Sequence, residues 1–232
     1  MTFHIVTIFP NIFDSYINES ILKRAQKNNI IKIKIHNLRD WTKDKHKTVD
    51  DAPYGGGPGM VMKIEPIYQA IKAIKHKSPH WSRTGTKTRK HKVILLSAKG
   101  KQWNQPRAKK FAKLDEIILI CGHYEGIDER VKKFVDEEIS IGNYILTGGE
   151  IAALAIIDSI ARLLSGTLGN VESIKYESHS TPGLLEYPQY TRPEIFKIKK
   201  RKYKVPKILL SGHHKEIEKW REKHSKKIIS KL

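Results

Sequence analysis

Apolar and polar residues follow two different periods along this chain. Ile31, Ile33 and Ile35 alternate with polar residues, as in a half-buried strand, whereas the apolar spacing across residues 15–28 indicates a helix. Apolar runs predict further strands at residues 5–9, 93–97, 117–121 and 139–146, and helical spacing predicts helices at 64–75, 104–114, 127–135 and 151–164. Because strands and helices alternate, we predict an α/β fold: a mostly parallel sheet with helices on both faces.

The composition changes after this alternating region. Residues 167–179 contain Gly, Ser and Asn but few large apolar residues, and residues 180–232 are strongly basic, with one predicted helix at 215–225. We therefore predict three parts: a large α/β domain over residues 1–166, a linker over residues 167–179, and a small, mainly helical domain over residues 180–232.

The charge of the chain is strongly positive. Its 44 Lys and Arg against 24 Asp and Glu give a formal net charge of +20. Residues 75–92 hold seven Lys or Arg and no acid, and residues 197–232 hold fourteen Lys or Arg and three Glu. One such cluster is equally well explained as a solvated surface, but two clusters beside a more neutral core favour a polyanionic partner, most simply nucleic acid.

Several classes of protein are disfavoured by the sequence. Cys121 is the single cysteine, which excludes an intramolecular disulfide framework and a cysteine-based zinc site. The apolar run at residues 151–157 is far shorter than the ~20 residues of a membrane span, and the first ten residues lack the basic start of a signal peptide. We therefore expect a cytoplasmic protein without a membrane segment. The motifs G-x-G-x-x-G, G-x-x-x-x-G-K-[ST] and H-E-x-x-H are absent, so dinucleotide, P-loop and zinc-protease sites lose support.

Glycines follow three consecutive predicted strands. They occur in residues 98–100, in residues 122–126, and as Gly142, Gly148 and Gly149 in and after the third strand. The carboxyl ends of parallel strands meet at one edge of a sheet, where α/β folds bind ligands, so the three loops predict a pocket. The alternative is that glycine merely ends each strand. Thr147 and Glu150 also fit a capping box that would begin the helix at residues 151–164.

A second glycine-rich segment spans residues 50–59. Four glycines and two prolines in these ten residues exclude the interior of a helix or a strand. The segment is either a flexible connector or a loop that closes on a bound partner.

Seven segments in order resemble one enzyme family. Residues 8–10, 51–60, 95–100, 121–130, 140–150, 190–193 and 205–214 together resemble the bacterial tRNA (guanine-N1)-methyltransferases, which belong to the knotted SPOUT class. The resemblance implies a deep C-terminal trefoil knot in the α/β domain and a homodimer whose active site is shared between the two protomers. It also implies transfer of methyl from S-adenosylmethionine (SAM) to N1 of guanosine 37, just 3′ of the anticodon in tRNA.

The resemblance also implies the site residues. SAM would be bound by the three glycine-containing loops, at Leu95, Leu96, Ser97, Gly100, Gly122, Tyr124, Glu125, Gly126, Ile141, Gly142, Asn143, Tyr144, Ile145, Leu146, Gly148 and Gly149. The tRNA would be bound by Tyr54, Gly55, Gly56, Gly59 and Arg192 and by the basic C-terminal domain.

Two residues would carry the chemistry. N1 of guanine becomes a nucleophile only as its proton leaves and negative charge builds on O6, so the site needs a base near N1 and a cation near O6. By resemblance Arg162 is the cation, although an i,i+4 pair with Asp158 would also explain it. Glu177 matches the aspartate that most relatives use as the base; a one-residue shift would place Ser178 there, and a plain surface acid is the other alternative.

Glu177 in place of the usual aspartate is a departure from the family pattern, because one extra methylene changes the reach of the carboxylate. Further departures at His123, Asn143, Ala152 and residues 98–99 affect SAM and tRNA contacts. No metal cage is evident, and the resemblance leaves a magnesium requirement open, with Glu125 and the nucleotide as the only evident ligand sources.

Two other functions remain as alternatives: a basic RNA-binding protein without catalysis, and a SPOUT methyltransferase acting on another RNA.

Overall fold

The computed structural model describes residues 1–77, 90–168, 177–181 and 183–227. The chain divides into two compact units, Met1–Gly169 and Asn170–Leu232, and each is described by itself. The predicted basic cluster at 75–92 and the predicted linker lie largely outside the described residues. Within the described part, no helix combines the length and the apolar character needed to cross a bilayer.

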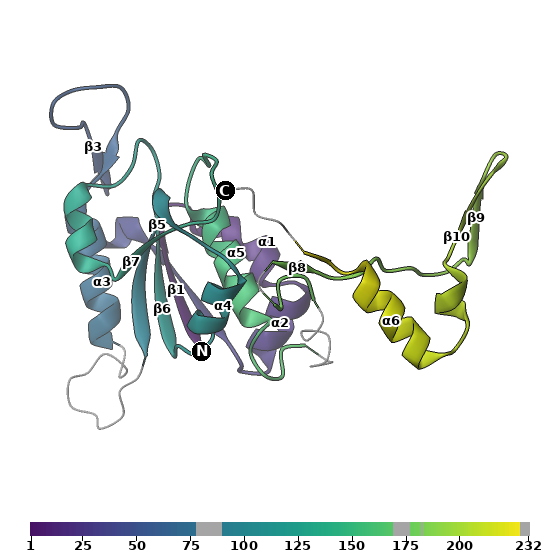
Figure 1. The fold of residues 1–232 in the computed structure, drawn as a ribbon. Coiled ribbons are helices and arrows are strands. Elements are labelled where there is room, and N and C mark those ends of the chain that lie inside the picture. The colour runs from purple at the N-terminus through teal and green to yellow at the C-terminus, as the bar shows by residue number, and fades with distance from the viewer. Residues whose placement is uncertain (78–89, 169–176, 182, 228–232) are drawn as a thin grey trace. The chain divides into compact units, whose positions relative to one another are not determined.

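The first unit is built on a five-stranded parallel sheet (Figure 1). In spatial order its strands are β2 (Lys32–Asn37), β1 (Thr2–Thr7), β6 (Glu116–Cys121), β5 (His91–Gln102) and β7 (Glu137–Ser140). Parallel strands need both faces covered, and β6 is accordingly buried along its whole length. The predicted mostly parallel α/β fold is therefore confirmed for this unit.

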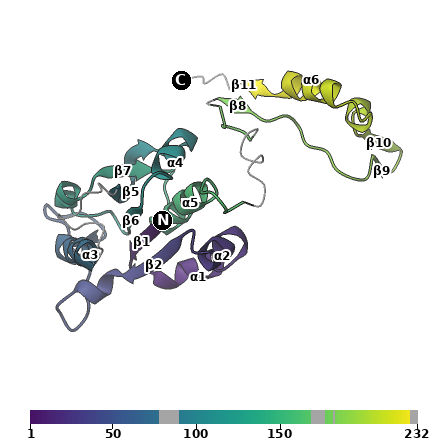
Figure 2. The same cartoon turned by 90° about the horizontal axis from the view of Figure 1, so that it is seen from below.

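Helices cover both faces of the sheet (Figure 2). One face carries η1 (Pro10–Phe13), α1 (Asp14–Ile17), α2 (Ser20–Lys27), α4 (Gln105–Phe111) and α5 (Glu150–Ala161), and the other carries η2 (Leu38–Trp41), α3 (Ile64–Lys77) and η3 (Glu129–Phe134). Neighbouring residues of a strand point to opposite faces of the sheet. Ile117 and Leu119 of β6 therefore pack in the hydrophobic core under α2, α4 and α5, and Ile118 packs in the core under α3.

Three predicted elements differ in type or continuity from the observed ones. The single helix at 15–28 is split into α1 and α2, because Glu19 is extended and Ser20 has a φ of 45°. The helix at 127–135 is the 3-10 segment η3, and the strand at 139–146 ends at Ser140, so the rest is loop.

Strand β5 is longer than predicted and pairs with β7 twice. Leu96 and Lys101 both pair with Ile139, across an irregular stretch that includes Gly100. A Cβ at Gly100 would overlap the backbone nitrogen of Ile139, so glycine allows the two strands to approach closely.

The second unit contains two short antiparallel pairs, which were not predicted, and the helix that was. The elements are β8 (Leu184–Leu185) paired with β11 (Lys226–Lys227), β9 (Ile195–Ile198) paired with β10 (Arg201–Lys204), η5 (Lys207–Leu210) and α6 (His214–His224). Over residues 183–226 of this unit, no helix or strand residue is fully buried.

Candidate functional site

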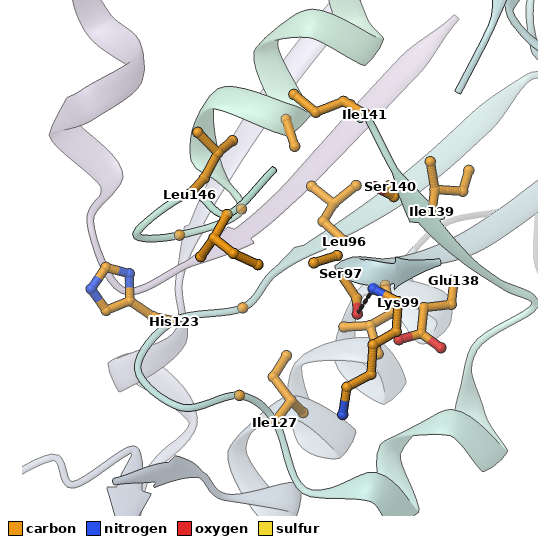
Figure 3. A pocket seen from close by; sticks show the side chains of 18 of the residues that line it. Leu96, Ser97, Lys99, His123, Ile127, Glu138, Ile139, Ser140, Ile141 and Leu146 are labelled. Atoms are coloured by element: carbon orange, nitrogen blue, oxygen red, sulfur yellow. Dashed lines mark hydrogen bonds between the residues drawn. The ribbon is translucent and has the colours of Figure 1, made fainter. Parts of the chain in front are cut away.

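A pocket of about 340 Å³ lies at the carboxyl ends of β5, β6 and β7. Its wall includes Leu95, Leu96 and Ser97 from β5, the loop after β6, and the loop after β7. Figure 3 shows Ile141 and Leu146 on one side of the pocket and Ile127 with Lys99 on the opposite side. The loops after β6 and β7 therefore line one pocket, as predicted. The first predicted loop, residues 98–100, is instead part of β5, from which Ala98 and Lys99 join the wall.

The loop after β6 is held by a neighbouring extended segment. Met62 donates its backbone N–H to the carbonyl of Gly126 (2.9 Å), and Asp128 donates to the carbonyl of Met62 (3.0 Å). Gly126 has a φ of 139°, a conformation that side-chain-bearing residues rarely adopt. These bonds fix the loop in place, so that residues 122–129 form one wall of the pocket.

The loop after β7 returns to the end of β6. Gly149 donates its N–H to the carbonyl of Gly122 (2.9 Å), and a Cβ at Gly149 would lie 2.8 Å from Cα of Cys121. A Cβ at Gly148 would overlap the side-chain ends of His123 and Glu150. These close approaches explain the glycine pair, which helix capping alone would not require.

The predicted capping box between Thr147 and Glu150 is wrong. Helix α5 begins at Glu150 after Gly149, with no side-chain capping bond. The Glu150 carboxylate is 3% exposed and accepts a hydrogen bond from the Thr7 hydroxyl at 2.7 Å. Glu150 therefore binds Thr7, 143 positions away, instead of forming the local cap with Thr147. The local sequence around Glu150 gives no sign of this long-range bond.

This buried carboxylate acts on the neighbouring thiol of Cys121. Burial, with a smaller contribution from the charge of Glu150, raises the pKa of the Cys121 thiol well above its usual value. The thiol is therefore protonated at neutral pH and acts as a small core side chain. Neither Cys121 nor Glu150 lines the pocket itself.

His123 provides an unpartnered polar atom at the pocket wall. Its Nδ1 is buried and has no hydrogen-bond partner among the described residues, while the ring packs edge-on against Phe9 at 4.9 Å. A buried nitrogen without a partner is costly, so a ligand that hydrogen-bonds to it would be favoured.

Two predicted cofactor residues do not line the pocket: Gly100, which packs against β7, and Asn143, whose neighbours Gly142 and Tyr144 do line it. Of the four glycines in residues 50–59, Gly59 lies against a pocket loop, since a Cβ there would meet the side chain of Glu125 at 2.5 Å, whereas the other three have nothing within 4 Å. Tyr54, Gly55 and Gly56 project into solvent between β3 (Asp50–Asp51) and β4 (Val61–Met62).

A protein-family model described as "tRNA (Guanine-1)-methyltransferase TrmD" matches residues 1–231. The chain belongs to this family. A tRNA (guanine-N(1)-)-methyltransferase of Citrifermentans bemidjiense is 52% identical over 224 residues, 96% of this chain and 84% of that protein. One from Clostridium botulinum is 51% identical over 232 residues, 100% of this chain and 90% of that protein. The crystal structure of tRNA (m1G37) methyltransferase from Aquifex aeolicus is 40% identical, with a TM-score of 0.76, and covers 97% of this chain and 88% of that chain.

The two residues predicted for catalysis in this TrmD-family chain belong to different units. Arg162 is half-buried at the C-cap of α5 and is absent from the pocket wall. Glu177 belongs to the second unit, where its carbonyl accepts from the N–H of Ser180 (2.9 Å). The hydroxyl of Ser178, the alternative match, accepts from the N–H of Glu186 at 3.1 Å.

Arg192 lines a separate groove in the second unit. The groove is bordered by Tyr187, Tyr190 and Trp220, and the guanidinium of Arg221 lies 4.9 Å from the ring centre of Tyr187. The predicted tRNA-binding residues are thus divided between the two units.

No group of three His, Cys, Asp or Glu able to hold a metal ion occurs among the described residues. Glu125, named as a candidate magnesium ligand, has its side chain against Gly59. The residues therefore do not fit a protein-held magnesium site.

Proposed function

We propose that this chain transfers a methyl group from SAM to N1 of guanosine 37 in tRNA. The observation that carries the proposal is a glycine-walled pocket at the carboxyl edge of the parallel sheet, in a chain whose family is that of the tRNA (guanine-1)-methyltransferases. A tRNA substrate would place the reaction in the cytoplasm of a bacterium.

The pocket residues fit SAM on three counts. A volume of about 340 Å³ lies in the range of small-molecule sites. Leu95, Leu96, Ile141 and Leu146 offer apolar contact for a base, while the backbone around Gly122 and Gly148 offers close polar contact. The unpartnered Nδ1 of His123 offers one more polar contact. When bound, SAM would supply an electrophilic methyl group on its sulfonium.

The protein's own residues would prepare the guanine. Glu177 would accept the N1 proton, and Arg162 would donate hydrogen bonds to O6 as negative charge builds there. Arg162 does not line the pocket of its own chain, so the proposal has it act in the pocket of a second copy. The two copies would then share each active site.

Exposed apolar side chains support a homodimer. Ile145, in the loop after β7, is 84% exposed, and Ile151, in α5, is 54% exposed. Further large exposed side chains come from the same loop after β7 (Tyr144), from η1 (Ile12) and from α1 (Tyr16). α5 and η1 contact each other, which places Ile151 and Ile12 on neighbouring elements. Apolar surface of this kind at the mouth of a site favours burial by another protein surface.

The proposal includes the knot and the domain division. The chain leaves β7 at the sheet edge, continues through residues 141–149 and returns to Gly122 beside β6, while β5 beyond Gly100 pairs with β7. This return supports a trefoil knot. The functional domains would be residues 1–166 for SAM, a linker over 167–179, and 180–232 for tRNA.

The test is incubation of the protein with labelled SAM and an unmodified tRNA transcript, followed by mapping of the methylated base. We expect 1-methylguanosine at position 37 and no transfer to a matched transcript carrying adenosine there. Methyl at a ribose, or at another RNA position, would overturn the substrate assignment. Binding of tRNA without heat of SAM binding in calorimetry would favour the non-catalytic RNA-binding alternative instead.

A further inference from the structure

The hairpin of β9 and β10 carries an unusual concentration of positive charge. Residues 195–204 contain six Lys or Arg and no Asp or Glu. All eight residues in the two strands are exposed, and their partners are each other: Phe196 with Tyr203, and Lys197 with Lys202. Among the described elements, no other makes substantial contact with either strand, and Figure 1 shows a free-standing ribbon.

The register separates two faces. Cross-strand partners share a face and neighbours in the strand point to opposite faces. One face therefore holds Phe196, Ile198, Arg201 and Tyr203, and the other holds Ile195, Lys197, Lys202 and Lys204. Lys199 and Lys200 form the turn between the strands.

This arrangement is unfavourable for the isolated protein. Two lysines directly opposite each other repel, and a two-stranded hairpin is marginally stable on its own. Lys199 also has a φ of 53°, in the region where glycine is most at ease. Neither charge pairing nor burial in the described structure explains the composition, whereas a polyanion would relieve the repulsion.

We propose that residues 195–204 form an RNA-binding arm. Lys197, Lys202, Lys204 and the two turn lysines contact phosphates, and Phe196 with Tyr203 stacks on an unpaired base of the same RNA. Exposed aromatic side chains next to lysines are the combination that binds single-stranded segments of RNA. The inference rests on the proposed function, in which the RNA is tRNA, and assigns part of its binding to this hairpin.

The first test measures how tRNA affinity depends on salt. In the full-length protein, Lys197, Lys202 and Lys204 are each replaced by Gln, and a control protein carries Lys23→Gln, Lys27→Gln and Lys32→Gln at exposed positions in the first unit. Each lost phosphate contact lowers the slope of log K against log salt by about 0.7–0.9, so the hairpin variant should lose about 2 to 3. A change no larger than that of the control would overturn the proposal.

A second charge variant guards against loss of the hairpin fold. Lys199→Gly with Lys200→Asn places glycine at the position whose φ is 53°, which favours a two-residue hairpin turn, and removes two charges. We expect the slope to fall by about 1.5–2. An unchanged slope would again overturn the proposal.

The aromatic face is tested by Phe196→Leu with Tyr203→Leu, which keeps apolar side chains but removes stacking. We expect tRNA affinity to fall roughly five- to 150-fold for each base that is stacked, with the salt slope unchanged. Unchanged affinity would refute the stacking. A change in the protein's mass in solution without a change in RNA affinity would mean that this face covers another copy of the chain.

Two readouts separate this inference from the function on which it rests. If the wild-type protein binds SAM and methylates tRNA but the hairpin variants match the control, the RNA-binding arm is refuted and the proposed function stands. If the wild-type protein neither binds SAM nor methylates tRNA, the proposed function is refuted, whatever the hairpin variants show.

Discussion

The close approach of the loop after β7 to the end of β6 makes two neighbouring glycines respond differently to alanine. A Cβ at Gly149 would lie 2.8 Å from Cα of Cys121 and 3.1 Å from the nitrogen of Gly122. Both are backbone atoms, so they cannot rotate away. A Cβ at Gly122 would instead lie 3.4 Å from Cδ1 of Ile127 and 3.5 Å from the carbonyl of Leu96, which is ordinary contact.

The magnitude for Gly149→Ala follows from this geometry. Normal carbon–carbon contact is ~3.5–4.0 Å, so the loop must move by roughly 1 Å, which strains its hydrogen bond to Gly122. Overpacking of this kind costs about 1–3 kcal/mol, which for a unit of this size lowers the melting temperature by roughly 2–12 °C. Gly122→Ala should shift it by less than about 2 °C.

The assay is thermal unfolding of both variants, followed by calorimetry with SAM. We expect Gly149→Ala to melt lower and to bind SAM at least about tenfold more weakly, because displaced loop atoms no longer meet the ligand. Equal melting temperatures and SAM affinities for wild type and Gly149→Ala would refute the packing argument. Equal destabilisation by the two substitutions would refute the contrast.

Three further outcomes are expected. Glu177→Gln and Arg162→Ala should each remove most methyl transfer and leave SAM affinity within about twofold, as checked by turnover and calorimetry; near-full turnover in either variant contradicts its role. Burial, then the positive charges of His4, Lys34 and Lys77, lowers the pKa of His36 to about 4 from 6.5, so the unfolded state binds the proton more tightly. Stability is therefore full above pH 6.5 and falls by roughly 1–2 kcal/mol towards pH 4, after discounting for partial exposure, and His36→Gln should flatten this part of the pH profile. Burial, and then Asp158, raise the pKa of the Tyr16 hydroxyl. Tyr16→Phe removes this hydroxyl from the proposed dimer surface, so it should alter the sedimentation of the protein and leave SAM affinity unchanged.

The pocket could be predicted from the sequence because its position depends on the order and direction of the strands. Once residues 93–97, 117–121 and 139–146 are taken as parallel strands, the loops that follow them must meet at one edge. Gly100 was grouped with these loops by proximity in sequence, yet its role is close packing against Ile139. Periodicity gives the order of elements but not the distance between two backbones.

Long-range partners account for most of what was missed. Thr7 binds Glu150 across 143 positions and replaces the expected cap, and the turn at Ser20 interrupts an apolar pattern that reads as one helix. The β9–β10 hairpin was not predicted, because its many lysines made the segment look like a solvated basic region. Phe196 and Ile198 do alternate with lysines, which is the signal that could have revealed it.

The central claim is that β5 and the loops after β6 and β7 enclose the methyl-donor site, and a crystal structure of the protein with SAM bound tests it most directly. The account predicts SAM between residues 95–97, 122–126 and 141–149, with a polar group of SAM within hydrogen-bond distance of Nδ1 of His123. SAM bound elsewhere, or these loops unable to admit it, would contradict the claim.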